Sequence, residues 1–347
     1  TKGAPSPRVW HTAVWTGKEM IVWGGEDGKT MFNTGGAYDP STDAWRPIST
    51  KGAPSPRVWH TAVWTGKEMI IWGGRSLEGF PLNTGGRYDP STDTWRETST
   101  KNAPSPRQQW HNAIWTGKEM IIWGGGEREA SQDVGWKYDP STDTWKEIPT
   151  SFSGGIATIA VWADTEMIIW DEGEDGRIHL NTGGRYNPLA SLPLTDTWKE
   201  ISATNAPPAR GGYDAVWTGK EVIIWGATWI NDSSFINNVW KYNPFKDTWR
   251  EISTKNVPSR RGGHAVAWTG KEMMIWGGFI IGMRVSTNYL NTGWGYNPVS
   301  DTWKEISTKN APSERFIPTV VWTGKEMIIW GGQNNEGYLN TGGRYLP

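Results

Sequence analysis

The sequence predicts an all-β protein built from seven copies of a four-stranded unit, and three observations support the prediction. The pentapeptide Trp-Thr-Gly-Lys-Glu recurs along the 347 residues, once in a degraded form, at spacings of 47 to 55 residues. Around it, short apolar runs alternate with turns that contain Gly or Pro. The composition, with 27 Trp and 43 Gly, suits many short strands joined by tight turns. A fixed period of about 50 residues is typical of units that stack on one another.

The repeats cover the whole chain, so a single domain over residues 1–347 is expected. Each unit is anchored by the Trp that opens the pentapeptide, or its degraded form Trp-Ala-Asp-Thr-Glu. The anchors are Trp15, Trp64, Trp115, Trp162, Trp217, Trp268 and Trp322.

Each unit contains four phrases that predict strands. The first, HTAVWT at His11–Thr16, alternates in polarity, and the second, EMIIWGG at Glu68–Gly74, is an unbroken apolar run that indicates burial on both faces. Thr-Gly-Lys between them is a short hairpin loop. The third phrase, NTGGRYDP at Asn83–Pro90, leads through a proline turn to the fourth, DTWKEIST at Asp301–Thr308 in its clearest copy. Four antiparallel strands per unit predict a seven-bladed β-propeller.

The repeats resemble those of the kelch family, in a Trp-rich, bacterial-type form. The marks are a double glycine after the second strand, as at Gly24-Gly25 and Gly73-Gly74, a Tyr several positions before a Trp, as in Tyr38 with Trp45, and a Pro-Arg-x-x-His lead-in. Two blades depart from the pattern, with Asp171-Glu172 and Gly226-Ala227 in place of the glycines. The resemblance is specific for the fold, but kelch propellers include enzymes and adaptors alike.

Most of the tryptophans recur at fixed positions of the repeat, at the ends of the first and second strands and on the fourth. Blade-to-blade packing produces such recurrence, so we interpret these tryptophans as core.

The last blade lacks its fourth phrase. After Tyr345 only Leu346 and Pro347 follow, so the sequence supplies 27 of the 28 strands that seven blades need. Thr1-Lys2-Gly3 matches the tail of that phrase. Three explanations stay open: the strand lies upstream in a longer precursor, it is absent and leaves an open outer edge, or another chain supplies it.

Charge and composition exclude several classes of protein. The net charge is −1 with acids and bases interspersed, so no nucleic-acid surface is indicated. No apolar run approaches a membrane span. The chain contains no Cys, which excludes disulfide frameworks and thiol nucleophiles. The missing start Met and the resemblance to secreted bacterial kelch proteins predict an extracytoplasmic protein, periplasmic or secreted.

The loops between the second and third strands differ completely among blades, whereas the Thr-Gly-Lys hairpins and Asp-Pro-Ser-Thr turns barely change. A specific partner is therefore expected on the loop face, although drift in solvent loops would look the same. The longest and most apolar loops belong to blades 5 and 6. They either form an exposed contact patch or cover their own blades. The partner-binding candidates are Trp229, Ile230, Phe235, Ile236, Phe279, Ile280, Met283 and Tyr289.

A second candidate site lies at the connectors between blades, where the kelch pattern places the mouth of the central channel. Six arginines there could hold an acidic peptide or a sugar carboxylate, or each could tie to backbone or acids of a neighbouring blade. Three neighbouring tryptophans could stack a sugar or fill the channel. The residues are Arg8, Arg57, Arg107, Arg210, Arg261, Arg315, Trp10, Trp59 and Trp110.

The function predicted first is a non-catalytic interaction module, a scaffold or accessory subunit that binds another protein subunit, which could also donate or cover the last strand of blade 7. The alternative is a carbohydrate-binding, lectin-like propeller. A sugar-modifying kelch enzyme is disfavoured: the galactose oxidase type needs a cysteine, and no acid–base constellation like that of the sialic acid epimerase type stands apart from the repeat. No catalytic residue, cofactor or metal site is expected. The recurring histidines, among them His11 and His60, belong to the repeat pattern.

Overall fold

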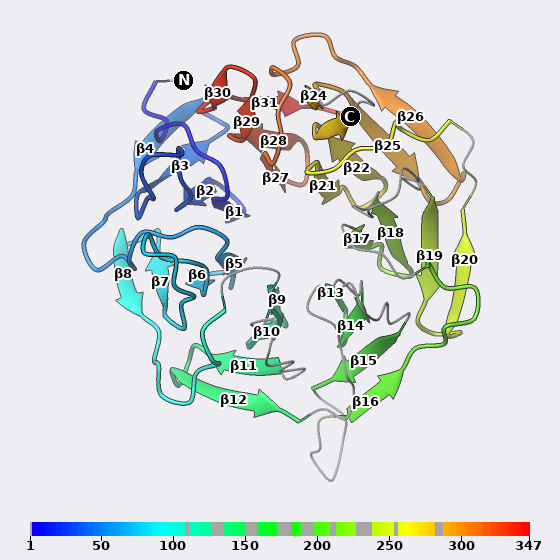
Figure 1. Ribbon diagram of the computed structural model, residues 1–347, viewed down its shortest axis with the longest axis horizontal. Coiled ribbons are helices and arrows are strands. Elements are labelled where there is room, and N and C mark those ends of the chain that lie inside the picture. Colours follow the sequence, from blue (N-terminus) through cyan, green and yellow to red (C-terminus); the bar gives the residue numbers. More distant parts are fainter. Residues whose placement is uncertain are drawn as a thin grey trace.

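The strands form seven small antiparallel sheets arranged as blades around a central axis (Figure 1). The computed structural model describes residues 2–107, 111–125, 135–149, 158–171, 182–188, 197–208, 213–226, 238–252, 256–281 and 287–347. The predicted seven-bladed β-propeller is confirmed, with four antiparallel strands in each of the first six blades and three in the last.

The first strand of each blade lies innermost. These strands are β1 (Thr12–Trp15), β5 (Thr61–Trp64), β9 (His111–Trp115), β13 (Thr158–Ala163), β17 (Tyr213–Trp217), β21 (Ala265–Trp268) and β27 (Thr319–Trp322). Each contacts the next around the axis, and β27 contacts β1, so the ring of inner strands is closed.

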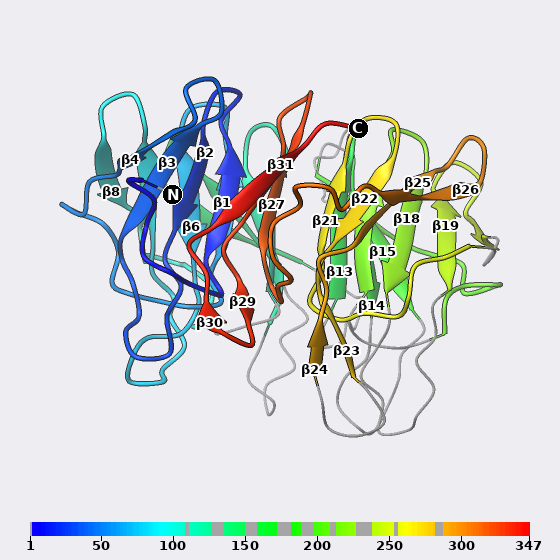
Figure 2. The ribbon, with the colours of Figure 1, turned by 90° about the horizontal axis from the view of Figure 1, so that it is seen from above.

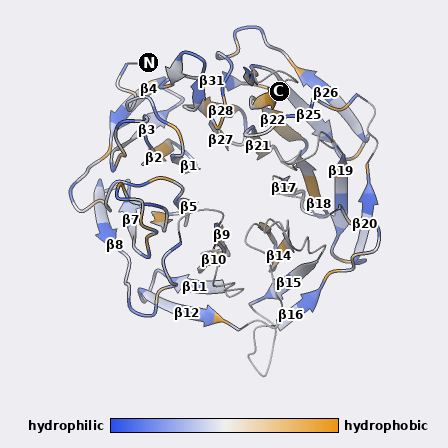
Figure 3. Ribbon diagram, viewed as in Figure 1, coloured by the Kyte–Doolittle hydropathy of each residue, from blue (hydrophilic) through white to orange (hydrophobic). Residues whose placement is uncertain are grey.

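The second strands are apolar and buried on both faces, because each is central in its sheet and each sheet is packed between two others. They are β2 (Met20–Trp23), β6 (Met69–Trp72), β10 (Met120–Gly124), β14 (Glu166–Asp171), β18 (Val222–Gly226), β22 (Met273–Trp276) and β28 (Met327–Trp330). Figure 3 shows the hydrophobic residues concentrated on these strands and the hydrophilic residues on the outermost ones.

The third strands carry the Gly-Gly-x-Tyr phrase or its variants. They are β3 (Gly35–Asp39), β7 (Gly85–Asp89), β11 (Gly135–Asp139), β15 (Gly183–Asn187), β19 (Val239–Asn243), β25 (Gly293–Asn297) and β31 (Gly342–Tyr345). The fourth strands are β4 (Ala44–Pro47), β8 (Thr94–Glu97), β12 (Thr144–Ile148), β16 (Thr197–Glu200), β20 (Thr248–Glu251) and β26 (Thr302–Ile306).

The recurring turn chemistry holds each blade to the one before it. Asp93, at φ 53° in the turn before β8, accepts a hydrogen bond from the Tyr88 hydroxyl at 2.6 Å and another from the Ser49 backbone N–H of blade 1 at 2.8 Å. Trp95 Nε1 donates to the Ser49 carbonyl at 2.8 Å. The Tyr–Trp spacing of the repeat therefore joins strands within a blade and also joins neighbouring blades.

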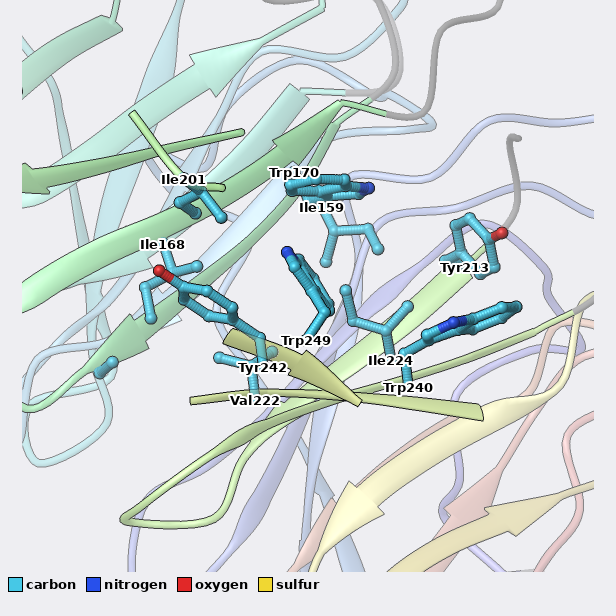
Figure 4. Close-up of a cluster of buried hydrophobic side chains, with 11 residues drawn as sticks. Ile159, Ile168, Trp170, Ile201, Tyr213, Val222, Ile224, Trp240, Tyr242 and Trp249 are labelled. Atoms are coloured by element: carbon cyan, nitrogen blue, oxygen red, sulfur yellow. The ribbon is translucent and has the colours of Figure 1, made fainter. Parts of the chain in front are cut away.

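The core lies at the junctions between blades rather than at the centre of the ring. Figure 4 shows the junction of blades 4 and 5, where Ile201 of blade 4 packs among Trp170, Tyr242 and Trp249. The same kind of cluster recurs at the other junctions, including that of blades 7 and 1. The ring is therefore held together by packing between neighbouring blades.

Candidate functional site

The loops between second and third strands share one face of the ring with the connectors between blades, and we call this the variable-loop face. Hydrogen bonds join each loop to the next connector: Gly25 N–H donates to the Arg57 carbonyl at 3.0 Å, and Arg57 N–H donates to the Phe32 carbonyl at 3.3 Å. At the closure of the ring, Arg8 N–H donates to the Leu339 carbonyl at 3.2 Å. Two loops form hairpins that extend from this face, β23 (Phe279–Ile281) with β24 (Thr287–Tyr289) and β29 (Gln333–Asn334) with β30 (Gly337–Tyr338) (Figure 2).

The connector arginines lie inside the protein, and their guanidinium groups are bonded to the chain. Arg57 is 1% exposed. Its Nη1 donates to the carbonyls of Gly73 at 3.0 Å and Thr84 at 2.7 Å, while Nε and Nη2 donate to Ser55 and to the Thr84 hydroxyl. Burial lowers the pKa of Arg57 to about 10, which still leaves it charged at neutral pH.

The same bonds recur at Arg8, Arg261 and Arg315, and Arg107 is equally buried. Arg8, Arg57, Arg261 and Arg315 therefore each tie the end of the second strand of their own blade to the start of its third strand. This geometry favours a structural role for the arginines over anion binding. Their partners are carbonyls of the same blade, whereas the sequence suggested partners in a neighbouring blade. Arg210 lies outside the described residues.

Two of the channel-mouth tryptophans form a strained aromatic pair. Trp10 and Trp59 precede β1 and β5, and their rings lie edge to face with centroids 5.4 Å apart. Both have positive φ, 56° and 59°, which is unfavourable for a bulky residue. The Arg75 guanidinium lies over the Trp59 ring at 4.3 Å. At the equivalent place in blade 6 stands Gly263, with φ 60°, so the repeat imposes this backbone conformation. Trp110 lies outside the described residues.

The apolar loop of blade 6 folds back onto its own surroundings over the part that is described. Phe279 is 8% exposed, and its ring lies edge to face with Phe316 at 5.0 Å. The Tyr289 ring also contacts Phe316, with centroids 6.3 Å apart, and Ile280 is half-buried. Phe279 is thus local cover rather than part of an exposed patch. Trp229, Ile230, Phe235, Ile236 and Met283 lie outside the described residues.

Among the described residues, the large apolar side chains that are exposed on the variable-loop face belong instead to blade 2. Leu77 and Phe80 are 66% and 68% exposed. A tight turn holds them outward: Gly79, at φ 88°, donates its N–H to the Ser76 carbonyl, and Ser76 donates its own to the Phe80 carbonyl. The apolar content of the loops does not predict that this pair is exposed. The signal in the sequence is a Glu-Gly turn with Leu on one side and Phe on the other. On the opposite face, Phe245 and Val299 are exposed in the turns before β20 and β26.

The recurring histidines are part of the junctions between blades. His60 Nε2 lies 3.0 Å from Thr12 Oγ1 of the preceding blade, and its ring meets Trp23 edge to face. Burial, the largest cause, lowers the pKa of His11 to about 3 and that of His111 to about 4, so both are neutral at physiological pH. In the described part of the chain no group of three or more His, Asp or Glu side chains is placed to hold a metal ion.

The closed ring of four-stranded blades, with its Gly-Gly, Tyr–Trp and Pro-Arg-x-x-His positions, defines a β-propeller of the kelch type. The family model described as the KLHDC2/KLHL20/DRC7 Kelch-repeats domain matches residues 1–159 and 212–342. The chain belongs to the kelch-repeat family.

Relatives of this chain match over part of their length only. Adagio-like protein 3 of Oryza sativa subsp. japonica is 26% identical over 148 residues, 41% of this chain and 23% of the relative. Kelch domain-containing protein 3 of Homo sapiens is 29% identical over 163 residues, 44% of this chain and 42% of the relative. Tip elongation aberrant protein 1 of Schizosaccharomyces pombe is 29% identical over 124 residues, 35% of this chain and 11% of the relative. The match thus spans less than half the length of each.

Among the described residues, no helix is long and apolar enough to cross a lipid bilayer.

Proposed function

We propose that this protein is a non-catalytic interaction module, a scaffold or accessory subunit of a larger assembly, which binds another protein through the variable-loop face. The observation that carries the proposal is the pair Leu77 and Phe80, two large apolar side chains held in solvent on the face where the blades differ. Exposed apolar side chains that lie together on one surface are typical of protein contacts. Membership of the kelch-repeat family agrees with this function.

The rigid ring supports the same proposal. The buried second strands and the Thr-Gly-Lys hairpins repeat nearly unchanged, so the fold leaves variation to the loops. Loops on a rigid scaffold bind with little loss of conformational entropy. The proposed binding surface includes the loops of blades 5 and 6. We also propose that the protein is extracytoplasmic.

A matched pair of double variants tests the proposal. The protein is first isolated together with its partner from its natural source. Each double variant is then tested for whether it still binds that partner. We expect Leu77→Asp with Phe80→Asp to lose the partner, because a charge would be buried in the interface. Phe245→Asp with Val299→Asp, two residues on the opposite face that are even more exposed, should retain it. Loss with the second pair and retention with the first would refute the proposed face.

The alternative function, carbohydrate binding, is favoured by one observation, the edge-to-face pair of Trp10 and Trp59. Adjacent indole rings suit the apolar faces of sugars. Replacing both residues with Gly, the residue of blade 6, should abolish any signal on a glycan array. A blank array with the native protein would exclude this alternative.

A further inference from the structure

Four half-buried side chains of blades 1 and 2 gather where the connectors lead into β1 and β5, two inner strands that contact each other. Two of them are Trp10 and Trp59, whose rings lie edge to face with centroids 5.4 Å apart. The other two are Glu26 and Arg75, the residues that follow the double glycines after β2 and β6. A backbone bridge joins each charged residue to the residue just before the tryptophan of its own blade. We call these four residues the Trp–Arg–Glu cluster.

The fold does not require the cluster. The same backbone bridges occur in blades 6 and 7, where Phe279 and Gln333 take the charged position. The tryptophan position holds Gly263 in blade 6 and Ile317 in blade 7. Of the blades in which the structure describes both positions, only blades 1 and 2 therefore combine an indole with a charged residue. Blades 6 and 7 fold without this combination, so it is free to serve a ligand.

The guanidinium group of Arg75 is held in place without an anionic partner. Its Cζ lies 4.3 Å from the centroid of the Trp59 ring, and its Nε has no hydrogen-bond partner within the described part of the chain. Arg87 and Arg96 of the same blade, in contrast, both form ion pairs with Glu68. A planar guanidinium that is stacked on a ring and lacks a counter-ion is suited to bind a carboxylate.

Glu26 adds a carboxylate next to this cation. Burial, the largest cause, raises the pKa of Glu26, and the positive charge of Arg75 acts in the opposite direction. The two groups therefore lie close enough for their charges to interact, but Arg75 influences Glu26 through its charge and not through a hydrogen bond. Each group keeps hydrogen-bonding capacity for a ligand.

Taken together, the side chains of the cluster select one class of ligand. The guanidinium binds a carboxylate, while the neighbouring glutamate repels a second negative charge and accepts hydrogen bonds from hydroxyl groups. The indole rings offer an apolar surface to the C–H face of a pyranose ring. A hexuronic acid residue carries a carboxylate, hydroxyl groups and such a face on one ring. An acidic peptide offers the carboxylate without the ring hydroxyls and the flat apolar face.

We propose that the Trp–Arg–Glu cluster is a binding site for a sugar that bears a carboxylate, namely a hexuronic acid residue of an acidic saccharide. The carboxylate of the sugar pairs with Arg75, its hydroxyl groups donate to Glu26, and its apolar face lies on Trp10. Trp59 positions the guanidinium by stacking on it. This inference rests on carbohydrate binding, the alternative function above, and adds the charge of the ligand and the residue that recognises it.

Titration calorimetry with matched sugars tests the requirement for a carboxylate. The probes are trisaccharides of galacturonate and of glucuronate, and their neutral counterparts are trisaccharides of galactose and of glucose with the same linkages. We expect at least one uronate to bind about tenfold or more tightly than its neutral counterpart, because a charge-assisted pair is lost with the carboxylate. A triglutamate peptide, which has the same number of side-chain carboxylates, should bind more weakly than that uronate.

Variants of the protein locate the binding. Arg75→Gln should weaken the uronate about tenfold or more, and Arg75→Lys, which keeps the charge but not the planar fork, should recover part of the loss. Arg260→Gln, at an exposed arginine of the connector in blade 6, is the matched control and should bind like the wild type. Melting temperatures close to that of the wild type show that each variant is folded.

The outcomes separate this inference from the function on which it rests. Equal affinity for a uronate and its neutral counterpart would overturn the inference and leave carbohydrate binding in place. Absence of binding to all four trisaccharides would overturn both. Uronate binding that Arg75→Gln leaves unchanged, or that Arg260→Gln weakens equally, would overturn the role of Arg75. Triglutamate that binds as tightly as the uronate would show a general carboxylate site and would overturn the sugar as its ligand.

Discussion

Replacing Arg57 with Met tests whether the connector arginines hold the fold or serve a ligand. Arg57 is 1% exposed and donates to the Gly73 and Thr84 carbonyls, which join the ends of β6 and β7. Met fills similar volume but leaves the buried Gly73 carbonyl without this donor, whereas the Thr84 carbonyl keeps its bond from the Gly73 N–H at 3.1 Å. An unsatisfied buried acceptor costs about 1–3 kcal/mol, so the free energy of unfolding should fall by about 2 kcal/mol. Arg57→Lys should recover only part of this loss, because an ammonium cannot reproduce the planar fork.

Urea unfolding followed by tryptophan fluorescence measures the effect. The control is Arg96→Met, which removes a side chain that is 60% exposed and pairs with Glu68. Glu68 itself is buried but keeps its pair with Arg87, so loss of the exposed Arg96 side chain should cost about 1 kcal/mol or less and this variant should remain close to the wild type. If the free energy of unfolding of Arg57→Met lies within about 1 kcal/mol of the wild-type value, Arg57 does not stabilise the fold. Anion binding would then be the better explanation of the connector arginines.

Three further predictions follow from the blade junctions. Because burial holds His11 and His111 neutral, with pKa values of about 3 and about 4, the unfolded chain binds more protons below pH 6.5. The free energy of unfolding is therefore highest above pH 6.5 and falls as the pH decreases toward 4, by about 2 kcal/mol per histidine at pH 5. Unfolding curves that do not change between pH 7.5 and 5 would contradict this. Trp59→Ala should be less stable than Trp59→Gly by about 1–2 kcal/mol, since only Gly adopts φ 59° without strain, and equal melting temperatures would count against the strain. Ile148→Ala should cost about 2–5 kcal/mol in urea unfolding, because Ile148 is fully buried between blades 3 and 4, and a loss below about 1 kcal/mol would refute the role given to this position.

The repeat made the fold predictable, while the candidate site was predictable only in part. Strand order, hairpin turns and the short last blade all follow from phrases that recur at one period. Recurrence cannot tell a buried arginine from a ligand-binding one, since Arg57 would repeat in either case. Its role depends on whether the carbonyls of Gly73 and Thr84 lie within reach, and that is set by the three-dimensional arrangement of β6 and β7.

The conformation of the loops also could not be predicted from the sequence. Apolar content favoured the loop of blade 6, but Phe279 turns inward because Phe316 of the next connector offers it a ring contact. Leu77 and Phe80 lie in a less apolar loop and are exposed because a four-residue turn leaves them no neighbour to pack on. Contacts between distant segments determine whether such a side chain is buried or exposed, and a local sequence pattern does not predict these contacts.

We propose that a protein partner binds the variable-loop face of this ring. Hydrogen–deuterium exchange of the protein with and without its natural partner tests the proposal. We predict slower exchange at residues 75–82 and in other loops of that face, with no change at the Thr-Gly-Lys hairpins such as 16–19. Protection confined to those hairpins, with unchanged exchange at 75–82, would contradict the account.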